Sequence, residues 1–450
     1  MQRNKPMMKK IIMATLFFTA GHVYAQDTPR KINQFSLQQA LDYAKQHSVQ
    51  VKNALLDIEI QHQVNRDVTS IALPQVNGSG SMIDYLDIPT TLLPAGSFGP
   101  GTPAQKLKFG TKWNSSAGFN FRQMLFDGQV FIALKARNGT MELSRKVEEL
   151  TQENIRANVY KIYYQLVLSK TQTQLLDANI ERLEKLQHDI KIMYDNGFVE
   201  KLDIDKITVQ LTNLQTEKFK VENMINNGYA GLKTLMGMPI KDSLALTDTL
   251  SDEQIKEGAL EIGEAKYSDR RDYQISEITN KLNVLNVRRY KLSQYPTLSL
   301  NADYSKQALR NKFDFFGTGD WFTTSYVGLQ LNVPIFSGFA LRARTEKARL
   351  ELQKSKNETE ALKISIDNDI QAAKNNFATA IASMDYQKKN MALAETVYNQ
   401  TKKKYEIGTA STTDINNVEV DLKTAQTNYI NALYDAIIAK VDFLKATGKL

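Results

Sequence analysis

The chain contains no cysteine, only four histidines and only two tryptophans in 450 residues. Without cysteine it forms no disulfide and offers no thiolate ligand to a metal. One histidine, His22, lies close to the N-terminus, and His47, His62 and His188 have no acidic or histidine partner at ligand spacing. We therefore expect no metal site and no cofactor.

Motifs of common enzyme classes are also missing. The sequence has no Gly-x4-Gly-Lys phosphate loop, no dinucleotide fingerprint and no nucleophile motif. We therefore expect a protein that is not an enzyme.

Charge of one sign does not dominate the chain. There are 57 Lys and Arg against 49 Asp and Glu, and four of the basic residues (Arg3, Lys5, Lys9 and Lys10) lie in the first ten positions. The rest of the chain is nearly balanced, which gives no argument for nucleic acid as a partner.

Those four basic residues precede an apolar run from Ile11 to Phe18, which is followed by Val23-Tyr24-Ala25. This order is typical of a secretory signal peptide, predicted here as residues 1–25 and cleaved after Ala25. An uncleaved anchor helix is the alternative, but the run is shorter than the roughly 20 residues that span a bilayer. No later segment approaches such a helix, so we expect any membrane insertion to use β-strands.

Proline and glycine are scarce over two long segments. Gly128 to Met193 contains no proline and one further glycine, and Phe339 to Lys404 contains neither residue. Apolar residues follow a heptad-like seam in the first segment, at Leu176, Leu183 and Ile190. Each segment predicts a helix of roughly 100 Å, at about 1.5 Å per residue.

The chain is internally duplicated. Tyr194-Asp195-Asn196-Gly197 followed by Asp203 returns as Tyr405-Glu406-Ile407-Gly408 followed by Asp414, at a constant offset of 211 positions. Phe126-Asp127-Gly128 likewise returns as Phe336-Ser337-Gly338 at an offset of 210. A repeat on this scale indicates two copies of one structural unit.

Each copy is predicted to contain a helix, two strands, a long helix, a tight turn and a shorter returning helix. The first helix is expected from Ser36 to Ser70, and residues 87–106, which are rich in Pro and Gly, are expected to be a loop. The predicted organisation is a first repeat at 26–237 (strands about 74–86 and 113–126, hairpin about 128–236), an acidic, irregular connector at 238–267, and a second repeat at 268–450 (strands about 296–308 and 321–336, hairpin about 338–446).

Four strands cannot close into a barrel, so a membrane-spanning sheet would need several chains. Both tryptophans, Trp113 and Trp321, fall at strand starts among clustered Phe and Tyr residues. That distribution favours aromatics at a membrane interface. A soluble sandwich edge packed on the same aromatics is the alternative. The long polar helices suit either a water-filled tube or a solid coiled coil.

On these motifs the chain resembles the TolC-like outer-membrane efflux protein family over nearly its whole mature length. Leu125-Phe126-Asp127-Gly128 and Pro334-Ile335-Phe336-Ser337-Gly338 are similar to its strand-to-helix junctions. The pattern Tyr-x-x-Gly-x5-Asp, at Tyr194–Asp203 and Tyr405–Asp414, is similar to its hairpin tips.

The resemblance implies a mainly α fold with membrane β: a homotrimer with a 12-stranded β-barrel in the outer membrane, continued by a 12-helix α-barrel through the periplasm. It implies a passive channel for efflux or type I secretion, whose partners are a periplasmic adaptor protein, an inner-membrane pump and outer-membrane lipid. The rival interpretation is an exported coiled-coil scaffold or periplasmic adaptor without a pore.

The resemblance also assigns roles to residues. Asp203 and Tyr405 match the pair that holds the channel closed, and Asp414 matches an acidic ring at the aperture, whereas Ala410 and Asn417 replace an Arg and a second Asp of the family pattern. The turns, Gly197, Phe198, Gly408 and Thr409, match the adaptor-docking tips. Ser411-x-x-Asp414 is also a capping-box spacing, so Asp414 has a second interpretation as a helix cap.

Overall fold

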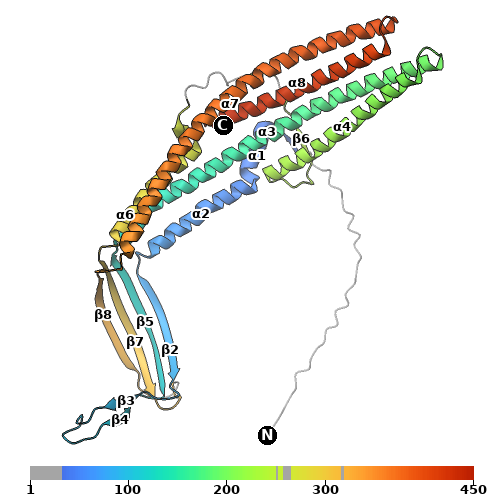
Figure 1. Cartoon of the computed structure of the whole chain (residues 1–450). Helices are drawn as coiled ribbons and strands as arrows, with labels where there is room; N and C mark the ends of the chain where they lie inside the picture. Colours follow the sequence, from blue (N-terminus) through green and yellow to red (C-terminus); the bar gives the residue numbers. More distant parts are fainter. Residues whose placement is uncertain (1–32, 250–251, 257–264, 316–318) are drawn as a thin grey trace, which may run out of the picture.

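The structure, a computed structural model, describes residues 33–249, 252–256, 265–315 and 319–450. The predicted signal peptide, residues 1–25, lies outside the described residues. The chain is elongated, with two helical hairpins at one end, a sheet that continues from the other ends of the long helices, and a small β-hairpin at the far extremity (Figure 1). The elements follow in the order β1 (Asn33–Phe35), α1 (Leu37–His47), α2 (Val49–Ser70), β2 (Gln75–Asp84), β3 (Thr90–Leu93), β4 (Gln105–Lys108), β5 (Trp113–Phe126), α3 (Gly128–Asp195), α4 (Lys201–Met236), β6 (Leu244–Leu246), α5 (Asp252–Lys256), η1 (Tyr267–Asp269), α6 (Arg271–Leu292), β7 (Thr297–Arg310), β8 (Phe322–Asn332), α7 (Ala340–Glu406) and α8 (Thr412–Ala446).

The two predicted long helices are continuous. α3 has 68 residues and α7 has 67 residues, which makes each about 100 Å long. Asp127 caps the start of α3, because its Oδ1 accepts a hydrogen bond of 2.8 Å from the Gln129 amide. The heptad-like seam of α3 is buried against α4, so the seam is what joins the two helices into a hairpin. None of the described helices is both long enough and apolar enough to cross a lipid bilayer.

The four long strands form one open antiparallel sheet in the order β2-β5-β7-β8. β5 pairs with β7 from Trp113 and Arg310 to Phe126 and Leu298, with one bulge between Met124 and Phe126. β2 and β8 are the edges of this sheet, and each therefore presents one row of backbone N–H and C=O groups without a partner strand in the described chain.

The register sorts the side chains of the sheet onto two chemically different faces, because successive residues of a strand point to opposite sides. One row joins Val76, Phe121, Ala302 and Val327, and the next row on the other side joins Asn77, Asn120, Asp303 and Tyr326. The apolar face continues through Leu298, Leu300, Leu329 and Leu331, and the polar face through Ser79, Ser81, Ser116, Ser299, Ser305, Thr324 and Gln330. Water therefore suits one face and hydrocarbon the other.

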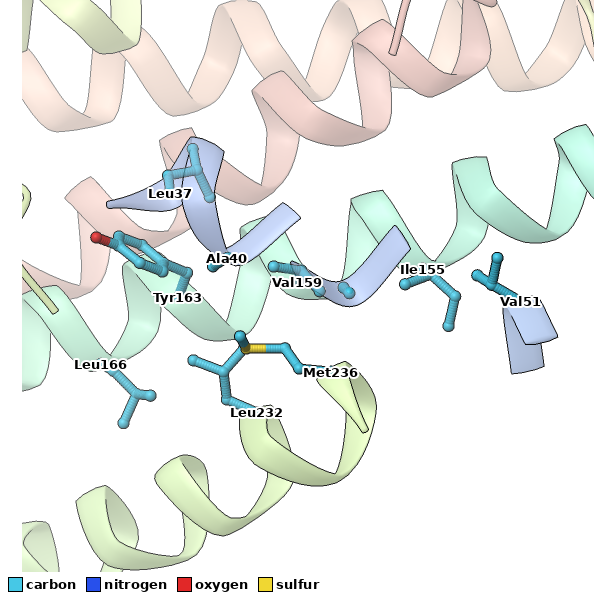
Figure 2. Close-up of a cluster of buried hydrophobic side chains, with 10 residues drawn as sticks. Leu37, Ala40, Val51, Ile155, Val159, Tyr163, Leu166, Leu232 and Met236 are labelled. Atoms are coloured by element: carbon cyan, nitrogen blue, oxygen red, sulfur yellow. The ribbon is translucent and has the colours of Figure 1, made fainter. Parts of the chain in front are cut away.

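A compact core lies halfway along the helices, where α1 packs against α3 and the end of α4 (Figure 2). Val159, Tyr163 and Leu232 are fully buried there. The Tyr163 hydroxyl donates to the Phe35 carbonyl at 2.9 Å and thus holds β1, which pairs in parallel with β6. The short β1–β6 sheet, which the sequence did not predict, consequently ties the N-terminal segment to the connector.

The predicted first helix, Ser36 to Ser70, is in fact two helices. Ser48 has φ −54° and ψ 129°, which ends α1 and redirects the chain into α2. The end of α4 presses on this junction: a Cβ on Gly237 would lie 2.2 Å from the His47 carbonyl oxygen. The break therefore makes room for the backbone of the returning helix.

The connector is more ordered than the sequence predicted, since it contains β6 and α5. Asp252 of α5 pairs with Lys388 of α7 at 2.6 Å, and Lys256 pairs with Asp385 at 2.6 Å. Ile255 between them is buried in the core of the second hairpin. These two reciprocal ion pairs and one apolar anchor fasten the connector across α7. Residues 250–251 and 257–264 of the connector lie outside the described residues.

The predicted loop at 87–106 is also wrong in part, because β3 and β4 pair in it as an antiparallel hairpin from Thr90 and Lys108 to Leu93 and Gln105. The last strand ends at Asn332 rather than near 336. Pro334 follows, and proline cannot donate a ladder hydrogen bond.

Candidate functional site: the ends of the helical hairpins

The two hairpin turns, which carry the duplicated motif, lie at the same end of the molecule, remote from the sheet (Figure 1). Both turns have the same hydrogen bonds. Gly197 N–H donates to Tyr194 and Phe198 N–H to Met193; Gly408 N–H donates to Tyr405 and Thr409 N–H to Lys404, all at 2.8–2.9 Å. This is the Schellman arrangement, which needs a left-handed residue after the helix. Gly197 and Gly408 supply it, with φ of 78° and 74°.

The turns expose apolar side chains to solvent. Phe198 is 79% exposed and Ile407 is 74% exposed. A Cβ on Gly197 or Gly408 would meet nothing within 4 Å, so the glycines are required by backbone conformation and not by close packing. The Thr409 hydroxyl also donates to the Lys404 carbonyl at 3.0 Å, which adds a side-chain hydrogen bond to the second turn. The result is an open, partly apolar surface on a rigid turn.

The two predicted acidic residues begin the returning helices in different ways. Asp414 forms the predicted capping box: the Ser411 amide donates to Asp414 Oδ2 at 2.9 Å, and the Asp414 amide donates to Ser411 Oγ at 3.1 Å. Its hydrogen bonds with Ser411 lower the pKa of this carboxyl. Asp203 makes no such box and instead lies 3.7 Å from the Lys206 ammonium.

Tyr405 links the two hairpins. Its hydroxyl contacts the Met193 sulfur of α3 at 3.6 Å. Burial raises the pKa of Tyr405, a hydrogen bond with Thr412 opposes this shift, and the carboxylates of Asp189 and Asp203 raise the pKa further. The structure therefore brings Tyr405 within electrostatic reach of Asp203. The hydrogen-bond partner of the hydroxyl on α3 is the thioether of Met193.

A buried polar network that the sequence did not indicate lies further from the turns. Arg182 of α3 pairs with Glu419 of α8, with 3.2 Å between Nε and Oε1, and its guanidinium lies 5.4 Å from the Tyr398 ring of α7. Arg182 also donates to Asn179, which in turn donates to Gln426 of α8 at 3.0 Å. These contacts join the first hairpin to both helices of the second.

Burial dominates the electrostatics of this network. Glu419 is only 4% exposed, and desolvation raises its pKa although Arg182 opposes the shift. Burial also raises the pKa of Tyr398 to about 12. The ion pair therefore offsets only part of the desolvation of Glu419. No sequence spacing could have revealed it, because Arg182 and Glu419 are 237 positions apart.

Between this network and the turns, the hairpins leave a cavity of about 340 Å³. Leu186, Met193 and Ile415 give it an apolar part, and Lys185, Asp189, Lys402 and Glu406 give it a charged rim. Tyr405 and Tyr398 both line it. The hairpins are thus not closely packed against each other along this stretch.

The aromatic residues predicted to lie at a membrane interface are found at the opposite end of the molecule. The ring centroids of Trp113 and Phe313 are 5.1 Å apart. The ring centroid of Phe315 lies 6.4 Å from that of Trp113 and 6.5 Å from that of Trp321. The two tryptophans therefore belong to one cluster, built from the start of β5 and the segment before β8. No group of three metal-ligating side chains occurs among the described residues.

The second half of the chain matches a known protein family. Residues 286–449 match the family model described as outer membrane efflux protein. The outer membrane protein TolC of Vibrio cholerae is 20% identical over 337 residues, which is 74% of this chain and 77% of that protein. The alkaline protease secretion protein AprF of Pseudomonas aeruginosa is 22% identical over 332 residues, 71% of this chain and 66% of that protein.

Solved structures share the fold along nearly the whole chain. The Campylobacter jejuni CmeC outer membrane channel superposes with a TM-score of 0.74 at 18% identity, covering 92% of this chain and 85% of that chain. The outer membrane protein VceC of Vibrio cholerae superposes with a TM-score of 0.71 at 15% identity, covering 92% of this chain and 96% of that chain.

Proposed function

We propose that this chain, which is similar to TolC and whose second half matches the outer membrane efflux protein family, is a passive outer-membrane channel of a tripartite efflux or secretion system. Its relatives include an outer membrane protein and an alkaline protease secretion protein. Its long helices would extend from the outer membrane into the periplasm.

The observation that carries this proposal is the open sheet with one apolar and one polar face. In lipid, each unpaired backbone group of an edge strand costs several kcal/mol. Pairing β2 of one copy with β8 of the next removes both edges. Three copies of the four-stranded sheet then close a 12-stranded barrel, with the face of Ser79, Asn120 and Gln330 around the lumen and the leucine-rich face in lipid.

The helices extend the same pore. Each chain contributes α3, α4, α7 and α8, so three copies supply a 12-helix tube. The polar surfaces of these helices suit a water-filled interior. We further propose that residues 26–237 and 268–450 are two structural repeats, each of which supplies one hairpin and two strands to the wall.

At the hairpin ends, we assign Tyr405 and Asp203 to the closed state. Tyr405 contacts α3 through Met193, and the charge of Asp203 acts on its phenol. Opening would separate the second hairpin from the first and expose this phenol. Arg182 and Glu419 hold the same two hairpins further from the turns.

Asp414 can serve both the helix and the aperture. Its hydrogen bonds with the amide and hydroxyl of Ser411 end on one oxygen, Oδ2, so Oδ1 remains available to a passing cation. Three copies around a narrow aperture would form one acidic ring, and Asn417 adds no second ring.

The exposed turns, Gly197, Phe198, Gly408 and Thr409, are the proposed docking surface for a periplasmic adaptor protein. Phe198 offers the apolar anchor, and the Schellman bonds keep its backbone rigid. The adaptor would connect the channel to an inner-membrane pump that supplies the energy, since we assign no catalytic residue to this chain.

Fractionation and conductance test the proposed function together. The full-length protein should be found in the outer-membrane fraction as a trimer after crosslinking, and the detergent-purified trimer should conduct ions in planar bilayers. An exported scaffold would instead be released with the soluble periplasm. A monodisperse, detergent-free monomer without conductance would rule out the channel.

A further inference from the structure

A groove crosses the apolar face of the sheet at its outer end. The small residues Gly78, Gly80 and Ala117 line it together with the rings of Phe119 and Tyr304. Lys306 and Trp321 lie in the same lining, and the groove encloses about 700 Å³. It is therefore large enough for part of an acyl chain and has a cation and an indole beside it.

The two glycines make the groove, and the backbone does not require them. Neither Gly78 nor Gly80 has a positive φ. A Cβ on Gly80 would come no closer than 3.8 Å to its nearest neighbour, the Ser116 oxygen, and a Cβ on Gly78 no closer than 3.6 Å to the Phe119 ring. A Cβ would therefore be tolerated at both positions without clash or strain. Glycine in a strand interior weakens the strand and often marks the close approach of a ligand.

Lys306 lies at the height expected for the outer boundary of the hydrocarbon. Register places it on the apolar face, opposite Ala117 and Thr323. Leu298, at the helical end of the same face, is eight residues away, or about 26 Å along the strand at roughly 3.3 Å per residue. The apolar band of outer-membrane sheets is about 25 Å tall.

The ammonium of Lys306 is free to meet a ligand. No acidic oxygen lies within ion-pair distance of it in the described part of the chain, whereas two nearby cations, Lys112 and Arg310, each have an acidic partner. Lys112 pairs with Asp84 at 4.0 Å, and Arg310 lies 3.9 Å from Asp314 and 5.5 Å from the Phe315 ring. Residues 316–318, outside the described chain, include no acid.

We propose that this groove binds a phosphate-bearing glycolipid of the outer leaflet, of the lipid A type, with an acyl chain over Gly78 and Gly80 and a phosphate at Lys306. This rests on the proposed outer-membrane function. An apolar groove that ends at an unpaired ammonium and an indole matches an amphipathic anion. Because β2 is an edge strand, the neighbouring copy in a trimer would complete the second wall, so bound lipid should stabilise the trimer.

The test measures the thermal dissociation of the purified full-length trimer by native mass spectrometry, with added bisphosphorylated lipid A or its dephosphorylated form. We expect phosphorylated lipid A to bind and raise the dissociation temperature. Lys306→Gln should bind it roughly fivefold more weakly, and Lys306→Arg should bind like wild type. Gly80→Leu should abolish binding by filling the groove, and Gly80→Ala should give an intermediate effect.

Gly328→Leu is the matched control, because Gly328 is a strand glycine on the polar face with nothing within 4 Å of its Cβ. Wild-type lipid binding by both Lys306→Gln and Gly80→Leu would overturn the proposal, as would equal binding of dephosphorylated lipid A. Conductance of the same trimers reports separately on the channel: conduction without lipid binding refutes only the groove, and loss of conduction in wild type refutes the proposed function.

Discussion

At the residue scale, glycine performs two different tasks at helix ends that look alike in sequence. Gly197 and Gly408 turn in open solvent, whereas Gly237 and Gly448 press on backbone: a Cβ on Gly448 would lie 2.5 Å from the Asp269 carbonyl oxygen. All four have positive φ. The first pair is needed for its conformation alone, and the second pair also for lack of a side chain.

This difference predicts unequal costs for the same substitution. Gly408→Ala should destabilise the protein by about 1 kcal/mol through left-handed strain alone. Gly237→Ala should destabilise it more, because its methyl would also collide with the His47 carbonyl. Thermal unfolding of the two variants in detergent checks the order. Equal shifts in the unfolding midpoint would contradict the close approach at Gly237.

Glu419 should give the helices a distinctive pH dependence. Its folded-state pKa is raised above the ordinary 4.5, so its contribution to stability is fully present below pH 4.5 and is lost as pH rises through the raised value. Relative to Glu419→Gln, wild type should therefore lose stability as pH increases across that window. Denaturant unfolding at a series of pH values measures this difference. The variant Glu395→Gln, at an exposed position, should show no such trend. A wild type that gained stability relative to Glu419→Gln as pH rises would contradict the raised pKa of Glu419.

The two roles of Asp414 can be separated. Asp414→Asn keeps a side-chain acceptor for Ser411 but removes the charge, so cation selectivity in single-channel recordings should fall while helix stability changes little. Ser411→Ala removes the reciprocal cap, at about 1 kcal/mol, and should leave selectivity intact. Unchanged selectivity in Asp414→Asn would leave the carboxylate with its capping role only.

At the scale of elements, rigid turns present exposed side chains for docking. Phe198→Ser should weaken binding of the adaptor protein without destabilising the channel, because the side chain is 79% exposed. Phe219→Ser on α4 is a matched control: its side chain is 72% exposed but lies 21 residues from Phe198, about 32 Å along a helix. Surface plasmon resonance on purified trimers measures the adaptor affinity of the two variants and of wild type. Equal adaptor affinity for both variants would remove Phe198 from the interface.

Periodic elements were predictable from sequence, and pairings between distant short segments were not. Period-two alternation such as Leu329-Gln330-Leu331 predicted β8, and the heptad-like seam of Leu176 and Leu183 predicted a long helix with one apolar face, because each pattern reflects one face of one element. β1 and β6 have only three residues each and pair across more than 200 positions. Their order depends on Tyr163 and the core around it, which no local pattern contains.

The same distinction applies to the candidate site. The turn glycines and the Ser411–Asp414 cap follow from local spacing and are present in the structure. Arg182 looks like any polar residue of a long helix, and only the packing of α3 on α8 makes it the partner of buried Glu419. The contact of Tyr405 with Met193 is likewise a tertiary contact, which the motif alone could not indicate.

At the scale of the whole molecule, the described chain leaves several surfaces without a partner. In the described chain, its sheet has two edges without a partner strand and its apolar face has no covering layer (Figure 1). In the proposed trimer, each feature would find its complement in further copies of the same chain and in lipid. The central claim is therefore that β2 of one copy pairs with β8 of the next.

Thiol crosslinking of those edges tests the claim most directly, because the chain has no cysteine of its own. In Ser79→Cys/Thr324→Cys both thiols lie on the polar face, one on β2 and one on β8. Within one chain the two positions are three strand spacings apart, roughly 14 Å, which is too far for a crosslinker that spans about 8 Å. We expect covalent dimers and closed trimers in outer membranes from the double variant, and none larger than a dimer from either single variant. Monomers alone, across several such pairs along the two edges, would contradict the account.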